Sequence, residues 1–476
     1  MNNSVDVLLT YPTDGLRLFQ SMIPTGLISI GTVLKNAGYS VKIIDFNHYS
    51  NDFRRELRRM SPKVVGIGGT TPSRMGSFLT SRIVKNIFPQ VPVVYGGVHA
   101  SFTASNTLQN IKTIDYIIKG EGEFSFLKLC DILTGNINEP ISSVSGLVWR
   151  QGTTIVENRP QRIDDLSLLP VPDRTLTGND YTLKMEFTGK RGDFIMTSRG
   201  CPAACNFCAA SRMFPGGVRT RPIESVMDEI ESLMSTKHIE GLKIFDSTFT
   251  ANREHVEQFC KSIQEFAIHW ECEIRADTVD RELLSLMRAS GCYYINIGME
   301  TVNKEHLKKI AKGISSDQVL NVLDICKKLD IRSKVFFTFG HIDQTLLECK
   351  QDIDFIKSNK SKIDFFGVTV GLRVYPGTRL EREYTKNGRD INWSKSVKHF
   401  ANILIGEPGD VPVVFQKQLG PLKLSYILMI LLKNRFVCTE KFLIRMAIEN
   451  ILNIVKLITL NLRYTRHRIE RLINPV

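Results

Sequence analysis

Three cysteines on one short segment, Cys201, Cys205 and Cys208, are the residues best suited to do chemistry in this chain. They follow directly after an apolar, strand-like run at 194–197. Closely spaced thiolates suit an iron–sulfur cluster, and a set of only three leaves the fourth iron of a [4Fe–4S] cluster open to another ligand. A structural zinc site needs a fourth ligand at short spacing, and none lies nearby, so zinc is disfavoured.

The other cysteines are isolated along the sequence, which is typical of small buried hydrophobic residues rather than of ligands. The N-terminus enters the apolar alternation Val5 to Leu9 without a basic segment followed by a long apolar stretch, so we expect no secretion signal. Thiols stay reduced in a non-secreted protein. We therefore expect a cytoplasmic location and metal ligation rather than disulfides.

The chain has 476 residues, more than one hydrophobic core normally serves, so we expect two or three domains. Residues 1–135 alternate short β-branched runs with helix-length amphipathic stretches. The runs are Val5 to Leu9, Val41 to Phe46, Val64 to Ile67, Val91 to Tyr95 and Tyr116 to Ile118. This pattern predicts an α/β domain with a doubly wound, Rossmann-like parallel sheet, whose ligand binds beyond the carboxyl ends of the strands.

The expected strand ends of this first domain are rich in glycine. The clusters are Gly66-Ile67-Gly68-Gly69-Thr70-Thr71, Gly96-Gly97-Val98-His99 and Gly120-Glu121-Gly122-Glu123. Glycine lets a ligand approach the backbone closely, although a single such cluster can equally serve only to turn the chain. Three clusters at successive strand ends favour a binding face. Because no G-x-G-x-x-G opens the first helix, a dinucleotide is the weaker choice of ligand.

Residues 136–190 are predicted to form a linker that contains a hairpin with its turn at Gly152 and a proline-rich crossing at 169–172. A second alternating series occupies 191–395, and its six strand–helix units predict a partial (β/α)6 TIM barrel. In such barrels the chemistry gathers at the carboxyl-end loops, which is where the three cysteines lie.

The spacing of Cys201, Cys205 and Cys208 resembles the C-x-x-x-C-x-x-C signature of the radical SAM superfamily. The resemblance implies a [4Fe–4S] cluster on these three metal ligands, with S-adenosylmethionine on the open iron. It also implies a set of residues that bind this cosubstrate, with Phe207 near the adenine. That set is Phe207, Asp246, Arg275, Glu300, Gly340 and Tyr375.

The carboxylate of Glu300, at a strand end, suits hydrogen bonds from ribose hydroxyls or an ammonium group. It can equally pair with Arg275 or Arg373. Arg275 in turn is a suitable partner for a carboxylate of the substrate or cosubstrate.

The domain order and the phrases at 97–101 and 115–123 resemble the cobalamin-binding branch of the radical SAM enzymes. The resemblance implies that the first domain holds cobalamin. The expected contacts are Gly68, Gly69, Thr70, Thr71, Gly97, His99, Gly120, Glu121 and Gly122. The D-x-H-x-x-G motif that supplies a lower histidine ligand is absent, so we expect His99 to line the pocket rather than ligate cobalt; alternatively, it is a polar residue at a strand end.

Residues 396–476 are expected to form a basic, helical C-terminal region that carries much of the formal charge of +13. Three readings stay open for it: contact with an anionic membrane surface, a helical cap on the barrel, and, third, nucleic-acid binding, which no motif supports. No transmembrane helix is expected, because charged residues interrupt each apolar stretch.

The resemblance implies reductive cleavage of S-adenosylmethionine, followed by methylation of an unactivated carbon of a small-molecule or lipid-like substrate. A ring-forming or rearranging enzyme of the oxidative cyclase type is the alternative, and a non-catalytic cobalamin sensor or scaffold is disfavoured by the intact cysteines. Methylthiolating relatives are disfavoured because Cys130 is the only cysteine of the first domain. A flavodoxin or ferredoxin is the expected electron donor.

Overall fold

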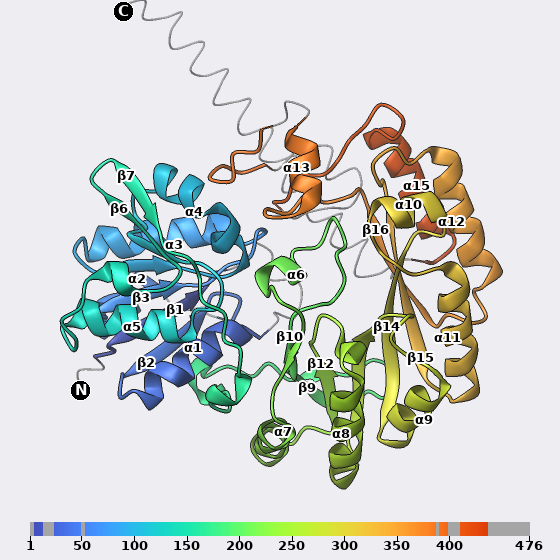
Figure 1. Ribbon diagram of the computed structural model, residues 1–476, viewed down its shortest axis with the longest axis horizontal. Helices are drawn as coiled ribbons and strands as arrows, with labels where there is room; N and C mark the ends of the chain where they lie inside the picture. Colours follow the sequence, from blue (N-terminus) through green and yellow to red (C-terminus); the bar gives the residue numbers. More distant parts are fainter. Residues whose placement is uncertain (1–3, 13–22, 49–52, 387–389, 398–409, 437–476) are drawn as a thin grey trace, which may run out of the picture.

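The computed structural model describes residues 4–12, 23–48, 53–386, 390–397 and 410–436. Two mixed sheets form its frame and lie side by side (Figure 1). The first sheet has the strand order β2-β1-β3-β4-β5-β6-β7 and the second has the order β16-β15-β14-β13-β12-β9-β8. The predicted α/β class, a Rossmann-like domain followed by a partial barrel, is confirmed.

The first sheet is parallel from β2 to β5, and β6 and β7 extend it as an antiparallel hairpin. Its strands are β1 Val7–Tyr11, β2 Val41–Asp45, β3 Val64–Ile67, β4 Val93–Tyr95, β5 Tyr116–Ile118, β6 Leu147–Gln151 and β7 Thr154–Glu157. The order 2-1-3-4-5 changes direction between β1 and β3, the place where doubly wound sheets bind their ligands.

Helices cover both faces of this sheet, which therefore has two apolar cores. The helices are α1 Thr25–Asn36, α2 Phe53–Met60, α3 Arg74–Ile87, α4 Val98–Asn110 and α5 Glu123–Thr134. Leu27 and Phe126 belong to the core under α1 and α5, and Phe78 and Leu108 to the core under α3 and α4. With helices on both faces, the sheet can bind a ligand only at its strand ends.

The second sheet is an open half-barrel of six parallel strands with one antiparallel strand at its edge. Its strands are β8 Leu183–Lys184, β9 Arg191–Ile195, β12 Gly241–Ile244, β13 His269–Ile274, β14 Cys292–Glu300, β15 Arg332–Phe339 and β16 Phe365–Val370. A short hairpin, β10 Ser198–Arg199 and β11 Arg219–Thr220, extends from the end of β9.

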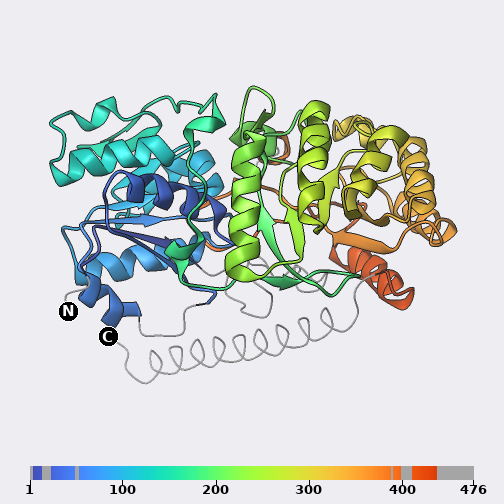
Figure 2. The same ribbon diagram turned by 90° about the horizontal axis from the view of Figure 1, so that it is seen from below.

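Helices line the outer face of the half-barrel, as Figure 2 shows from below. They are α7 Ile223–Lys237, α8 Arg253–Ile263, α9 Arg281–Ala289, α10 Lys304–Lys309, α11 Ser316–Lys328 and α12 Leu346–Ser358. Capping boxes start α11 at Ser315 with Gln318 and α12 at Thr345 with Glu348, so the side chains that end each loop also satisfy the first helical N–H groups. Two short helices, α6 Ala210–Met213 and α13 Arg379–Thr385, lie at the strand-end side.

The connector and the C-terminal region take part in both sheets. The hairpin at 147–157 belongs to the first sheet, while β8 pairs with β9 of the second. Of residues 396–476, only 396–397 and 410–436 are described, and α15 Pro421–Lys433 packs against α12 and β16 through Leu424, Ile427 and Leu431. The described part of the tail is thus a helical cap on the half-barrel, and residues 437–476 lie outside the described residues. None of the helices in the described ranges has the length and hydropathy needed to cross a bilayer.

Candidate active site

The three predicted cluster ligands lie on the loop that leaves the β10 strand of the half-barrel. Gly200, before the first cysteine, has φ +108°, and a Cβ there would lie 2.5 Å from the carbonyl oxygen of Gly217, so only glycine fits. The amide of Ala210 donates to Cys208 Sγ at 3.5 Å, and Cys201 Sγ lies 3.4 Å from Thr248 Oγ1. These contacts fix the cysteine loop both at its first cysteine and at its last.

These thiols fit a cluster better than any other cysteines of the described chain. Cys201 and Cys205 are partly buried and Cys208 is exposed, whereas the remaining described cysteines are buried and all are free. No three His, Cys, Asp or Glu side chains in the described ranges are arranged around a single metal ion. An iron–sulfur cube takes each thiolate to a different iron, so its ligands need not converge on one point.

Asp246, predicted to bind the cosubstrate, holds the base of the cysteine loop through its carboxylate. Its carboxylate accepts hydrogen bonds from the Thr197 amide at 2.7 Å, the Thr197 hydroxyl at 2.6 Å and the Ser198 hydroxyl at 2.6 Å. Burial raises its pKa, although these hydrogen bonds oppose the shift. Because both oxygens are occupied and the side chain is buried, Asp246 is placed to position the loop that carries Cys201.

Glu300, the second predicted carboxylate, lies at the end of β14 beside a lysine that the sequence did not single out. Its Oε1 accepts a hydrogen bond from Lys312 Nζ at 2.9 Å, and its Oε2 accepts one from Thr338 Oγ1 at 2.9 Å. The residue has φ +69°, an unusual conformation for a side chain of this size. Glu300 therefore pairs with neither Arg275 nor Arg373 by hydrogen bond, and Lys312 neutralises it.

Arg275 and Lys312 place positive charge near Cys205. The Arg275 guanidinium binds both oxygens of Asp277, at 2.9 and 2.8 Å, and the carbonyl of Lys312 at 2.8 Å. Burial raises the pKa of the Cys205 thiol, while Lys312 and Arg275 lower it. The pKa of Cys205 stays raised overall, and these two positive charges are the groups that oppose the effect of burial.

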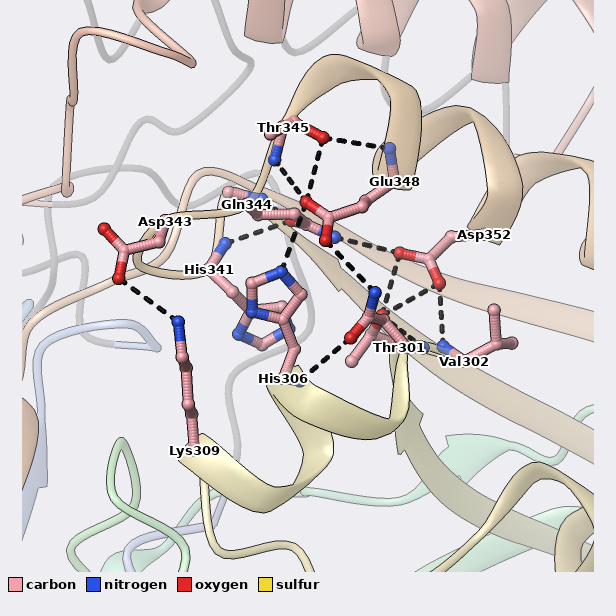
Figure 3. A network of polar contacts seen from close by, with 12 residues as sticks. Thr301, Val302, His306, Lys309, His341, Asp343, Gln344, Thr345, Glu348 and Asp352 are labelled. Atoms are coloured by element: carbon pink, nitrogen blue, oxygen red, sulfur yellow. Dashed lines mark hydrogen bonds and ion pairs between the residues drawn. The ribbon is translucent and has the colours of Figure 1, made fainter.

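A buried polar network ties the end of β14 to the end of β15 (Figure 3). Asp352 accepts hydrogen bonds from Thr301 Oγ1 at 2.9 and 3.0 Å, Val302 N at 2.7 Å and Gln344 Nε2 at 3.0 Å. Gln344 Oε1 in turn accepts from the amide of Gly340 at 2.8 Å. The predicted cosubstrate residues Glu300 and Gly340 are therefore held in register by side chains that sequence reasoning missed.

The last two predicted cosubstrate residues frame the same region. Phe207 is partly buried and packs against both the barrel core and a small core that contains Leu372 and Val374. The carbonyl of Tyr375 accepts a hydrogen bond from Thr378 Oγ1 at 2.7 Å, which shapes the turn at 375–378. These residues surround the cysteine loop at the carboxyl ends of the barrel strands.

A cavity of about 560 Å³ lies between the two strand-end faces. Seven of the nine predicted cobalamin residues line it: Gly68, Gly69, Thr70, Gly97, Gly120, Glu121 and Gly122. From the half-barrel, the lining includes Met196, Ser198, Arg199 and Phe245. A largely apolar cavity of this size, bordered by exposed glycine backbone, suits a cofactor.

His99 and Thr71, also predicted to contact cobalamin, lie outside this lining. His99 is buried, and its Nδ1 lies 3.1 Å from Thr71 Oγ1. The centroid of its ring lies 5.8 Å from that of Trp393 in a T-shaped arrangement. Its Nε2 has no hydrogen-bond partner among the described residues. His99, on the first turn of α4, thus contacts Thr71 and the C-terminal segment at Trp393.

Ion pairs clamp the two faces together at the mouth of the cysteine loop. Arg199 donates to Glu121 Oε1 at 2.6 Å and to Glu123 Oε1 at 2.5 Å, and Arg219 donates to Glu121 Oε2 at 2.7 Å. Burial alone would raise the pKa of Glu121, but the hydrogen bonds from Arg219 and Arg199 hold it below its ordinary value. Glu121, predicted as a cofactor contact, thus also joins the domains.

Comparison with known proteins agrees with this geometry. The family model of the radical SAM superfamily matches residues 195–356, and the B12 binding domain model matches residues 15–129. The chain is 30% identical over 396 residues to an uncharacterized methyltransferase of Pyrococcus horikoshii, covering 80% of this chain and 84% of that protein. It is 29% identical over 366 residues to an anaerobic magnesium-protoporphyrin IX monomethyl ester cyclase of Synechocystis, covering 74% and 70%.

A solved structure shares the fold. The radical S-adenosylmethionine methyltransferase TsrM of Kitasatospora setae, with cobalamin and a [4Fe–4S] cluster bound, superposes with a TM-score of 0.69 at 20% identity, covering 81% of this chain and 75% of TsrM. The two family models and the Pyrococcus relative show the family of the chain, and the solved structure agrees in fold. The chain belongs to the cobalamin-binding branch of the radical SAM enzymes, whose cofactors are a [4Fe–4S] cluster, S-adenosylmethionine and cobalamin.

Proposed function

We propose that the chain is a methyltransferase that acts on an unactivated carbon in the cavity between the two strand-end faces. The observation that carries the proposal is that one cavity is lined both by the glycine-rich strand ends of the first domain and by Met196, Ser198 and Arg199, which lead to the cysteine loop. The cluster and S-adenosylmethionine, when bound, supply a radical that removes a hydrogen atom, and cobalamin supplies the methyl group.

The protein's own residues position and shield these groups. Cys201, Cys205 and Cys208 would ligate the cluster, and Lys312 and Arg275 lie where they favour the thiolate of Cys205. Glu300 would receive hydrogen bonds from the cosubstrate at the end of β14. The apolar lining of the cavity would exclude water, which protects a radical reaction from side products.

The reaction is tested with anaerobically reconstituted protein. We expect iron and acid-labile sulfide in the wild type, and 5′-deoxyadenosine by mass spectrometry, with both strongly reduced in Cys205→Ala. Hydroxocobalamin should bind and give a visible spectrum. A wild type that contains no iron, or that leaves S-adenosylmethionine intact with a strong reductant, would contradict the proposal.

Oxidative cyclisation is the second candidate, because the Synechocystis relative named as a cyclase is nearly as similar as the Pyrococcus methyltransferase. The product mass separates the two reactions. A methyl transfer from S-adenosylmethionine with a deuterated methyl group adds a labelled carbon to the product, and cyclisation adds none.

We also propose a small-molecule or lipid-like substrate and contact with an anionic membrane. The outward side of α15 supports this, because it exposes Leu422, Tyr426 and Met429 together with Lys433 on one helical face. Leu422→Glu/Met429→Glu should lose flotation with vesicles that contain phosphatidylserine. Equal flotation of this variant and the wild type would refute the role of α15.

A further inference from the structure

Three exposed arginines gather beside the cysteine loop: Arg212 on α6, and Arg379 and Arg382 on α13. We call them the loop-side arginines. Arg212 lies far from the other two in sequence. Partial burial lowers the pKa of its guanidinium, and the nearby positive charges of Arg382 and Arg379 lower it further. Like charges are therefore held close enough to repel each other.

Both helices that carry these arginines are attached directly to the loop. Helix α6 begins at Ala210, whose amide donates to Cys208 Sγ at 3.5 Å. The amide of Leu380, between Arg379 and Glu381 on α13, donates to the carbonyl of Asn206 at 2.9 Å. The loop-side arginines are thus fixed relative to the cysteines, and Figure 1 shows α6 and α13 in the centre of the molecule at the strand-end side.

No carboxylate in the described ranges forms an ion pair with any of the three arginines. Glu381, on the same helix, is occupied, since it accepts hydrogen bonds from the amide of Gly377 at 2.7 Å and from Trp393 Nε1 at 2.7 Å. Glu383 contributes the one further acidic group of α13 among the described residues. The surface keeps a positive balance that an anionic partner would neutralise.

The position of the loop-side arginines favours a protein partner over a substrate. Met213 and Phe214, next to Arg212, line the cavity, but none of the three arginines does. Cys208 is the most exposed of the three cysteines. The positive charge of Arg212 thus lies on α6, the helix that directly follows the exposed Cys208.

We propose that the loop-side arginines form the docking surface for a small acidic one-electron carrier protein, which reduces the cluster held by Cys201, Cys205 and Cys208. The inference rests on the proposed function, because it needs the cluster. In this step the reduced carrier loses one electron and the cluster gains it, and no bond or proton changes place. Such encounters use small interfaces, and complementary charge accelerates them by steering.

The test compares two double charge reversals in the reconstituted full-length protein. Arg212→Glu/Arg379→Glu changes the docking surface, and Arg55→Glu/Arg58→Glu makes the same change of net charge on α2. Arg55 and Arg58 are exposed and have no carboxylate partner among the described residues. Helix α2, which carries them, belongs to the first domain, away from α6 and α13 (Figure 1). Reduction of the cluster is followed by stopped-flow absorbance with anaerobic, reduced flavodoxin, and separately with dithionite.

At low ionic strength we expect the second-order rate constant with flavodoxin to fall at least about tenfold for Arg212→Glu/Arg379→Glu and to stay near the wild-type value for the α2 variant. Arg212→Lys/Arg379→Lys should keep most of the rate, because it keeps the charge. Rising salt should slow the wild type toward the charge-reversed variant. At high ionic strength, where the negative charge of dithionite itself is screened, dithionite should reduce all variants equally.

Equal flavodoxin rates in the wild type and in Arg212→Glu/Arg379→Glu would overturn the proposal. So would a parallel loss with dithionite in a variant that retains its iron, since the arginines would then act on the cluster itself. A raised KM for S-adenosylmethionine with dithionite as reductant would assign them to the cosubstrate and overturn it too. A wild type without iron or sulfide refutes the proposed function instead, and that content is measured first. The milder Arg212→Gln/Arg379→Gln gives the same comparison if the charge reversal does not fold.

Discussion

Replacing Arg199 by methionine removes the guanidinium that joins the two strand-end faces and keeps most of its apolar stem. The side chain is 14% exposed and its two carboxylate partners are each 4% exposed, so solvent screens these bonds little. Charge-assisted hydrogen bonds contribute about 1.5–3 kcal/mol each. Glu121 keeps Arg219 and the amide of Ile163, whereas Glu123 keeps only Ser29 Oγ, so the loss falls chiefly on Glu123. We expect the local opening free energy to fall by about 3 kcal/mol.

Hydrogen exchange followed by mass spectrometry measures this opening. The amide of Phe126, in the first turn of α5, donates to the carbonyl of Gly122 at 2.8 Å, so its protection reports on the end of the clamp that carries Glu123. A loss of about 3 kcal/mol accelerates exchange roughly a hundredfold, at about 1.4 kcal/mol for each factor of ten. Arg59→Met is the control, because its pair with Glu56 is 64% and 21% exposed and should contribute little. If Arg199→Met exchanged no faster at this amide than Arg59→Met, the clamp would not hold the domains together.

Three further changes test the cosubstrate side of the site. In Lys312→Met, the pKa of Cys205 should rise above its already raised value, because a nearby positive charge is lost, and alkylation of Cys205 in cluster-free protein should become slower at neutral pH. In Gly377→Ala, the new Cβ would lie 2.3 Å from Phe102 Cδ1 at a φ of +79°, so the turn must move. Affinity for S-adenosylmethionine should then fall about tenfold or more, and it should recover in part in the double variant with Phe102→Ala. Burial raises the pKa of Asp352 from 3.8 to about 7, so the folded protein retains a proton that the unfolded chain releases. The stability contributed by this group therefore falls as pH rises from about 4 to 7, which lowers Tm over that range. In Asp352→Asn this contribution to the slope of Tm against pH should disappear.

Matched variants separate these effects from general destabilisation. Lys309→Met removes an exposed lysine near the same helix end and should leave the alkylation rate of Cys205 unchanged. Gly135→Ala has the same φ of +79° with no atom within 4 Å of the new Cβ, so it adds the backbone strain alone. An equal effect of either control and its test variant would refute the corresponding reasoning. An unchanged slope of Tm against pH in Asp352→Asn would assign that pH dependence to another group.

The sequence was sufficient to predict what depends on local chemistry. The cysteine spacing and the strand-end glycines are contiguous signals, so the cluster loop and most of the cavity lining were foreseeable. The doubly wound sheet was foreseeable because alternating β-branched runs and amphipathic helices permit few topologies, but its strand order was not predicted. Local pattern also predicted the hairpin turn at Gly152, but not which sheet its strands would join.

Contacts between distant segments were not predictable in this way. Lys312 is one of 62 lysines and arginines, and only the fold reveals that it reaches Glu300. Arg199 and Glu123 are 76 positions apart, so no local pattern links them. Asp246 was correctly singled out as a strand-end carboxylate, but sequence cannot show that its oxygens turn toward Thr197 and Ser198. A side chain's partner depends on tertiary packing, which short-range pattern does not encode.

The turn at 375–378 connects to the first domain through Glu381, Trp393 and His99, of which sequence analysis singled out only His99. Glu381 accepts from the amide of Gly377 and from Trp393 Nε1, and the ring of Trp393 contacts His99. The buried guanidinium of Arg74 binds the carbonyl of Trp393 at 3.0 Å and the carboxylate of Asp410 at 3.1 Å.

The two domains are therefore joined at two separate places, by Arg199 at the cysteine loop and by Arg74 at the C-terminal segment. Opening the faces like a hinge would break a buried ion pair at one place or the other, which costs about 3–5 kcal/mol when a charge is left unpaired. A reaction that passes a group from one face to the other needs a fixed separation between them. The paired contacts supply that constraint before any substrate binds, and the contact of Trp393 with His99 lies at the second of the two places.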